Sequence, residues 1–280
     1  PQVEKYKEKV NVFVTDNCST DDTKFYMEQL VKEYTCITYH RNEKNLGYSG
    51  NQINCIQMSD SIYTAILCDD DIYLDGAVDE ILNILNKPQE WSMLAINYYG
   101  FKDDFRKPSN TNFAPTEDRY FSRPLDLMNY PSVGHYSGLI FNSSLAKQII
   151  QNIIEKYDYK YYEQQRGVLH EAAFRVLSAS KLPAYFIGKR ILANNEVYVI
   201  DYDSLSHLCI EYFRFITKLY NENVINNNDL VYHKKIILDK LPRYSFSSLL
   251  NKKSNQVSNY WYQLENVGLI IPQNYLLLKV

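Results

Sequence analysis

The chain contains little glycine and no long apolar run. Nine of its 280 residues are glycine, against 26 tyrosines, which excludes a collagen-like or other glycine-based low-complexity chain. No apolar run approaches the about 20 residues that a membrane-spanning helix needs. No signal peptide opens the chain. We therefore expect a cytoplasmic protein.

Cysteine is also sparse, and its pattern excludes common uses of this residue. The cysteines form no Cys-x-x-Cys pair and their number is odd. This favours reduced thiols packed as small apolar side chains over a disulfide framework or a zinc site. A net charge of −3 gives no indication of nucleic acid as the main partner, and we expect none. The five residues are Cys18, Cys36, Cys55, Cys68 and Cys209.

Apolar strands alternate with helices along the first hundred residues. The strand-like runs are VNVFVT, CITYH, the run from Tyr63 to Cys68, and SMLAINY. The segments between them are helical in pattern; one of them, AVDEILNIL, has its apolar residues on one face. This alternation predicts βαβ units and an α/β fold with a mostly parallel central sheet flanked by helices.

Polar clusters follow three of these strands. They are Asp16-Asn17, Arg41-Asn42 and the run Asp69-Asp70-Asp71. Parallel sheets bind their ligands outside the carboxyl ends of the strands. The sequence therefore predicts a ligand site at this edge of the sheet.

The second half of the chain continues the pattern after an irregular stretch. Residues 100–131 show little periodicity and contain four prolines, so we expect a functional lid or disorder there. A strand (135–142), two helices (143–157 and 167–179) and a last strand (184–191) follow. We expect one domain over 1–199 and a helical extension over 200–280. That extension is rich in Lys, Tyr, Ile and Leu, which would allow peripheral membrane contact, but ordinary amphipathic helices are the simpler interpretation.

The three clusters, TDNCSTDDT (15–23), RNEKNLGYSGNQ (41–52) and CDDDIYLDGA (68–77), resemble in order and spacing the family 2 nucleotide-sugar glycosyltransferases. The likeness covers roughly residues 8–192 and implies the GT-A fold, which is Rossmann-like. It implies that Asp16 binds the nucleotide base. It also implies that Asn45, Gly47 and Asn51 pack beside the nucleotide. We add Asn17, and Arg41, which could face phosphate, to the nucleotide-binding set. For Arg41, a strand-ending role is an equal alternative.

The same resemblance gives the three aspartates their roles. Asp69 would face the ribose, and Asp70 or Asp71 would bind a divalent metal, Mn²⁺ or Mg²⁺, across the diphosphate. Such a cation offsets the repulsion of adjacent carboxylates and the charge of the leaving group. The alternative is that the aspartates cap the helix that follows them.

An inverting transfer also needs a base for the acceptor hydroxyl. In the family this group is an acid near the start of a late helix. The matching place here holds His170 and Glu171, of which we take Glu171 as the base and His170 as the alternative. A solvated helix carboxylate is the competing interpretation. His135 and Tyr136 would lie on the acceptor side or pack in the core.

The chain departs from the family at its beginning. It opens PQVEKYKEKV, which reads as the end of a crossover helix, so the family's first strand and helix, a unit of about 30 residues, have no counterpart. A sheet lacking that strand would expose two unpaired edges. We therefore expect the protein to be longer at its N-terminus.

Together these features predict an inverting, metal-dependent glycosyltransferase. It would move a sugar from a nucleotide sugar, UDP-linked in most of the family, to a glycan, lipid-linked saccharide or glycoprotein in bacterial surface polysaccharide synthesis. One alternative is a sugar-phosphate nucleotidyltransferase, which shares the sheet and the acidic metal site. The other is a catalytically inactive nucleotide-sugar-binding module, against which Asp16 and the three aspartates argue.

Overall fold

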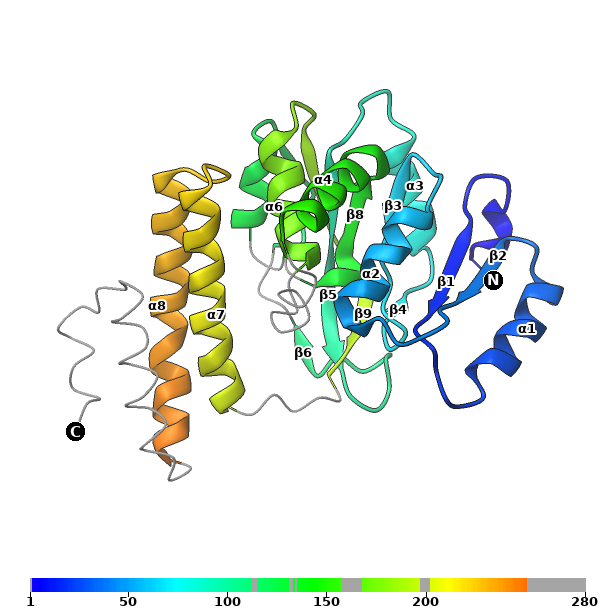
Figure 1. Ribbon diagram of the computed structural model, residues 1–280, viewed down its shortest axis with the longest axis horizontal. Helices are drawn as coiled ribbons and strands as arrows, with labels where there is room; N and C mark the ends of the chain where they lie inside the picture. Colours follow the sequence, from blue (N-terminus) through cyan, green and yellow to red (C-terminus); the bar gives the residue numbers. More distant parts are fainter. Residues whose placement is uncertain are drawn as a thin grey trace. The chain divides into compact units, whose positions relative to one another are not determined.

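The structure is a computed structural model, and it describes residues 2–111, 115–130, 133, 135–157, 168–196 and 202–250. The chain divides into two compact units, Pro1–Glu196 and Val197–Val280. The first unit carries all of the site residues predicted from the sequence, and Figure 1 labels most of its helices and strands.

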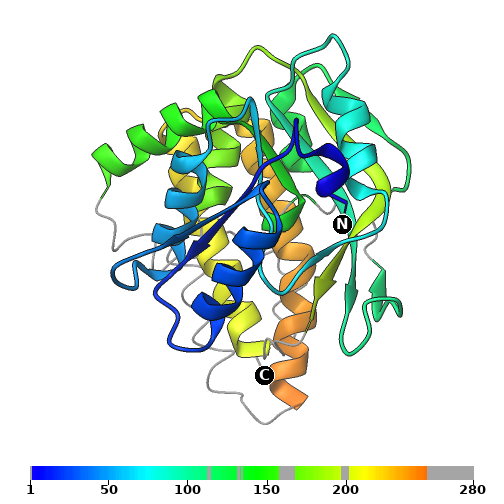
Figure 2. The same ribbon diagram turned by 90° about the vertical axis from the view of Figure 1, so that its right-hand side faces the viewer.

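Two parallel strands near the N-terminus form a small sheet of their own. A 3₁₀ turn, η1 (Glu4–Tyr6), precedes β1 (Val12–Asp16), which pairs with β2 (Ile37–Arg41) in a register that sets Asp16 opposite Arg41. Helix α1 (Thr23–Glu33) connects them and packs against β2, as Figure 2 shows. The apolar residues of β1 are half-buried, whereas the sequence predicted a buried strand. The reason is that β1 pairs on one side only among the described residues.

Seven strands form the larger sheet. Its main order is β3-β8-β5-β9-β4, while β6 pairs with β5 and β7 pairs with β9. The pair β5–β9 is parallel, and the other pairs of this sheet are antiparallel. The strands are β3 (Tyr63–Ala65), β4 (Ile72–Tyr73), β5 (Met93–Phe101), β6 (Asn110–Thr111), β7 (Arg119–Phe121), β8 (Leu139–Asn142) and β9 (Ala184–Asn195).

Helices cover this sheet, as Figure 1 shows, with α2, α4 and α6 in front of it. Alternate residues of β5 face opposite ways, and Leu94 and Ile96 share a buried cluster with Ile81 of α3. The arrangement confirms the predicted α/β class with a central sheet flanked by helices. The expectation of a mostly parallel sheet is wrong for this sheet, because only β5 and β9 pair in parallel among its described strands. The helices are α2 (Gly47–Met58), α3 (Ala77–Leu85), α4 (Ser143–Lys156) and α6 (Val168–Ala179).

The stretch predicted to be a lid or disorder is partly ordered. Strands β6 and β7 lie in it, and the 3₁₀ helix η2 (Pro124–Asn129) buries Leu125, Leu127 and Met128. A short-range pattern does not reveal β7, because this strand pairs with β9, which lies much later in the chain. The expectation that the protein is longer at its N-terminus, by the first strand and helix of the family, stays a prediction.

The described part of the second unit is a pair of helices. Helix α7 (Tyr202–Asn221) packs along α8 (Asn227–Leu250) through buried side chains that include Phe213, Ile216 and Ile237. Within this interface Tyr212 Oη lies 2.9 Å from Nδ1 of the buried His233. Among the described residues, no helix has both the length and the apolar character that crossing a membrane requires.

Candidate functional site

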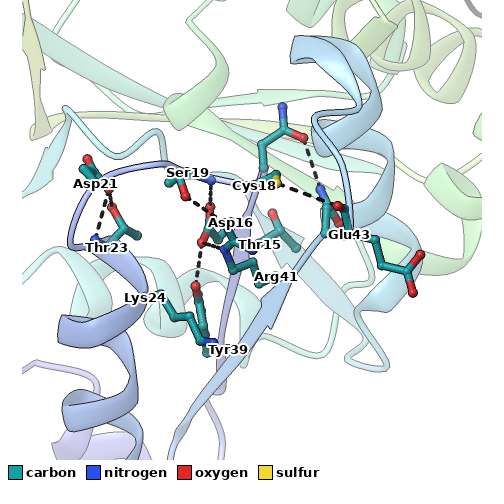
Figure 3. A network of polar contacts seen from close by, with 12 residues as sticks. Thr15, Asp16, Cys18, Ser19, Asp21, Thr23, Lys24, Tyr39, Arg41 and Glu43 are labelled. Carbon is teal, nitrogen blue, oxygen red and sulfur yellow. Dashed lines mark hydrogen bonds and ion pairs between the residues drawn. The ribbon is translucent and has the colours of Figure 1, made fainter.

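Asp16 ends β1 as a buried carboxylate surrounded by donors, as Figure 3 shows. Its Oδ1 accepts the backbone N–H of Ser19 at 2.7 Å, and its Oδ2 accepts the Tyr39 hydroxyl at 2.5 Å. Arg41 Nε forms an ion pair with the same oxygen at 3.2 Å. Burial alone would raise the pKa of Asp16, but these hydrogen bonds and the Arg41 charge lower it. Asp16 therefore holds the ends of β1 and β2 together as a carboxylate.

Asparagine side chains tie α2 to the end of β1. Asn17 Nδ2 donates to Asn45 Oδ1 at 3.0 Å and to the carbonyl of Gly47 at 3.1 Å. Asn51 Nδ2 donates to the carbonyl of Thr15 at 3.0 Å. The structure therefore brings together four residues that the sequence assigned to nucleotide binding.

Two backbone and side-chain details complete this asparagine cluster. Gly47 has φ of 73°, a left-handed conformation that favours glycine at the start of the helix. Buried Asn42, for which the sequence predicted no role, donates to Asn17 Oδ1 at 3.2 Å and to Asn51 Oδ1 at 3.0 Å. Its position directly after Arg41, at the end of a strand, is the feature of the sequence that could have identified it as part of the site.

The three consecutive aspartates have different environments. Asp69 and Asp70 are exposed, whereas Asp71 is 6% exposed. Partial desolvation and the neighbouring charge of Asp71 raise the pKa of Asp70. The carboxylate that is turned inward is therefore the last of the three.

Asp71 accepts hydrogen bonds on both oxygens from two distant segments. Oδ2 lies 2.5 Å from His135 Nε2 and accepts the Ser137 hydroxyl at 2.5 Å. Oδ1 accepts Asn194 Nδ2 and the backbone N–H of Asn195, both at 3.0 Å. Burial would raise the pKa of Asp71, but the hydrogen bonds from its neighbours lower it. Four contacts match the roughly four lone-pair directions of a carboxylate.

The side chains at this place fit a divalent cation by their chemistry. One ligand atom each from Cys68, Asp70 and Asp71 lies within 4.8 Å of the others. Carboxylate oxygens are the ligands that Mg²⁺ and Mn²⁺ prefer. Asp71 accepts donors from within the protein on both oxygens, whereas the Asp70 side chain is exposed.

Helix α6 places His170 and Glu171 in different surroundings. Glu171 is 1% exposed, and its Oε1 accepts Nε and Nη2 of Arg175 at 2.9 and 2.7 Å. His170 is half-buried, and its Nδ1 lies 3.2 Å from the Tyr136 hydroxyl. Tyr136 follows directly after His135, the residue that contacts Asp71.

One aromatic contact connects the asparagine cluster to this region. The ring centroids of Tyr48, in the first turn of α2, and Tyr136 lie 6.0 Å apart. The contacts therefore run from the Asn17–Gly47 cluster through these two rings to His170, and through His135 to Asp71.

The comparison with protein families decides the family of the chain. The model of "Glycosyl transferase family 2" matches residues 2–150. The chain belongs to glycosyl transferase family 2. A search of curated proteins gave no match.

Solved structures of Staphylococcus aureus TarS share the fold. TarS residues 1–349 in complex with UDP superpose with a TM-score of 0.60 at 15% identity, over 98% of this chain and 78% of that one. The complex of the same TarS fragment with UDP-GlcNAc gives 0.59 at 14% identity, with the same coverage. The chain covers 47% of the larger TarS structure, with a TM-score of 0.57 at 14% identity. These likenesses confirm the predicted GT-A fold.

Proposed function

We propose that this family 2 glycosyltransferase moves a sugar from a nucleoside diphosphate sugar to an acceptor hydroxyl. The observation that carries the proposal is the connected set of contacts from the Asn17–Gly47 cluster to His170 and Asp71. The TarS structures with UDP and UDP-GlcNAc support a uridine nucleotide as the first donor to test.

The nucleotide half of the proposed site is the polar cluster of β1, β2 and α2. Asp16 would orient the base from its buried position, directly or by fixing the loop that starts at Ser19. Arg41 donates Nη2 to the carbonyl of Ser19 at 2.8 Å, which adds a positive charge beside that loop. Asn45 and Asn51 hold the start of α2 against β1, and Asp69 would face the ribose.

Asp70 would hold the divalent ion, either Mn²⁺ or Mg²⁺. When bound, such an ion neutralises the charge that develops on a departing diphosphate. Asp71 would contribute by fixing the backbone that presents Asp70, because its own oxygens accept donors from His135, Ser137, Asn194 and Asn195. In this arrangement Asp70 would bind the ion, and Asp71 would position Asp70.

For proton removal from the acceptor, the geometry favours His170 over Glu171. The Glu171 carboxylate is buried, and the Arg175 guanidinium donates to its Oε1, which makes it the less accessible of the two groups. His170 is more accessible, and imidazole is the usual acid–base group near neutral pH. Glu171 would then be a positioning residue that anchors α6.

The acceptor is proposed more broadly. A glycan, a lipid-linked saccharide or a glycoprotein of a bacterial surface polysaccharide pathway would each present a hydroxyl. A cytoplasmic location and membrane contact through residues 200–280 remain predictions.

The test is a screen of nucleotide sugars with Mn²⁺ that measures released nucleoside diphosphate. We expect release with at least one UDP-sugar, loss of release in Asp70→Ala, and unchanged release in the control Asp60→Ala, an exposed carboxylate that precedes β3, the strand whose other end leads to the three aspartates. Release of pyrophosphate from a nucleoside triphosphate and a sugar phosphate would identify a nucleotidyltransferase instead. Donor binding without turnover, in every acceptor extract tried, would identify a binding module.

A further inference from the structure

An exposed aromatic ring lies between the two halves of the proposed site. Tyr48 follows Gly47 in the first turn of α2 and is 46% exposed. Its ring centroid lies 6.0 Å from that of Tyr136, and the Tyr136 ring lies 4.7 Å from the ring of His170. The three rings come from three separate segments. They therefore form a series of contacts that starts at an accessible tyrosine and ends at the proposed base.

The exposure of Tyr48 is costly unless a ligand covers the ring. A large aromatic side chain gains much of its stabilising energy from burial. Ligand pockets use such rings, together with a few well-placed polar groups, to bind the apolar part of a ligand. A ring that stays accessible beside the proposed base is thus suited to contact a substrate.

The amide of Gln52 supplies a polar group on the same side of α2. Gln52 lies one helical turn after Tyr48, so both side chains leave the same face of the helix. It is 9% exposed, and its Oε1 accepts no hydrogen bond from the described residues. Buried polar atoms without a partner are rare and lower stability. Helix α2 packs against α6, the helix of His170, on one side of the sheet (Figure 1).

A pyranose sugar matches this pair of groups. One face of its ring presents C–H bonds that pack on an aromatic ring, and its edge presents hydroxyls that donate to an amide oxygen. A lipid chain has no donor for Gln52. A serine or threonine side chain of a protein has a hydroxyl but no flat apolar face for Tyr48.

We propose that Tyr48 and Gln52 bind a pyranose ring of the acceptor, which makes the acceptor a saccharide. The inference rests on the proposed function, since it concerns the acceptor of that reaction. The ring belongs to the acceptor because the contacts of Tyr48 lead to His170, the group that takes the proton of the acceptor hydroxyl. Tyr48 covers the C–H face of the sugar, and Gln52 Oε1 accepts one of its hydroxyls.

The experiment is saturation-transfer NMR of the full chain, in the presence of UDP and Mn²⁺, with the methyl β-glycosides of glucose, galactose and N-acetylglucosamine. We expect transfer to the ring protons of at least one glycoside in the wild type and about fivefold less in Tyr48→Ala. Tyr48→Phe should keep most of the signal because it keeps the ring. The control Tyr26→Ala, which removes a tyrosine that is 62% exposed on α1, should keep all of it.

Two results of this experiment overturn the proposal. One is equal transfer in the wild type and in Tyr48→Ala. The other is no transfer to any of the three glycosides in the wild type.

Gln52→Met tests the amide with little change in side-chain volume. We expect about fivefold weaker glycoside binding and a Tm that is unchanged or higher, because the substitution removes a buried acceptor that has no donor. A lower Tm with unchanged glycoside binding would show a structural role and overturn the assignment of Gln52.

Calorimetry with UDP and with UDP-GlcNAc separates the acceptor from the donor. Tyr48→Ala and Gln52→Met should keep the wild-type affinity for both nucleotides. A loss for UDP-GlcNAc alone would assign the pair to the donor sugar and overturn the proposal. If neither nucleotide bound to the wild type, the proposed function would fail, whereas the glycoside signals, which require no turnover, would still report on Tyr48.

Discussion

Removal of the Asp71 carboxylate should destabilise the first unit strongly. Asp71→Ala deprives four donors of their acceptor. Two of these donors are the Ser137 hydroxyl, which is buried, and the backbone N–H of Asn195, which lies at the end of β9. A buried donor left without a partner costs about 1–3 kcal/mol. His135 is partly exposed, so it can recover a water contact. We therefore expect a loss of about 3–5 kcal/mol in the free energy of unfolding.

The assay is urea unfolding followed by tryptophan fluorescence. Trp91 is 3% exposed in the core of this unit, and a Trp261→Phe background makes it the sole tryptophan of the chain. Asp69→Ala is the matched control, since it removes an exposed carboxylate two positions away and should stay within about 0.5 kcal/mol. A loss below about 1 kcal/mol for Asp71→Ala would refute the claim that this carboxylate organises the site.

Three further predictions concern other parts of the chain. Glu171→Gln should lower the free energy of unfolding by about 2–4 kcal/mol, because it removes the buried anion that pairs with the Arg175 guanidinium. His170→Gln should instead lower kcat with little change in stability or donor KM; if Glu171→Gln lowered kcat and His170→Gln lowered stability, the base role would return to Glu171. Gly188→Ala should destabilise the protein by about 1–3 kcal/mol, measured by thermal unfolding, because the added Cβ atom would lie 2.3 Å from the backbone of Glu117. An unchanged Tm would contradict this contact. Burial lowers the pKa of His233 to about 4, so the unfolded chain takes up the proton first and stability falls as pH drops from about 6.5 towards 4. In urea unfolding, the wild type should lose about 3 kcal/mol more stability than His233→Gln across this pH range. Equal losses of stability in the two proteins would show that His233 does not titrate as described.

The sequence predicted most elements because their patterns are local. Helix α3 occupies the residues expected for it, and β9 extends the expected strand by four residues. Strand β3 is shorter than expected: it ends at Ala65, although the backbone N–H of Ile66 still donates to the carbonyl of Leu139. The apolar run continues past the strand and therefore hid its end.

The site was only partly predictable. Three adjacent aspartates look equivalent in the sequence, and their distinction depends on His135, Ser137 and Asn194, which are 64 to 123 residues away. Similarly, the partner of Glu171 is one helical turn away, but its burial depends on how α6 packs. Local patterns show which residue types are present, and tertiary contacts determine which of them face a ligand.

The central claim is that a divalent ion at Asp70 helps to hold a nucleoside diphosphate sugar. Its most direct test is calorimetric titration of the protein with UDP-GlcNAc, a donor chosen from the TarS complex, in the presence and absence of Mn²⁺. We predict that Mn²⁺ tightens binding at least tenfold in the wild type and has no effect in Asp70→Ala. Equal affinities with and without Mn²⁺ in the wild type, or the same Mn²⁺ effect in Asp70→Ala, would contradict the claim.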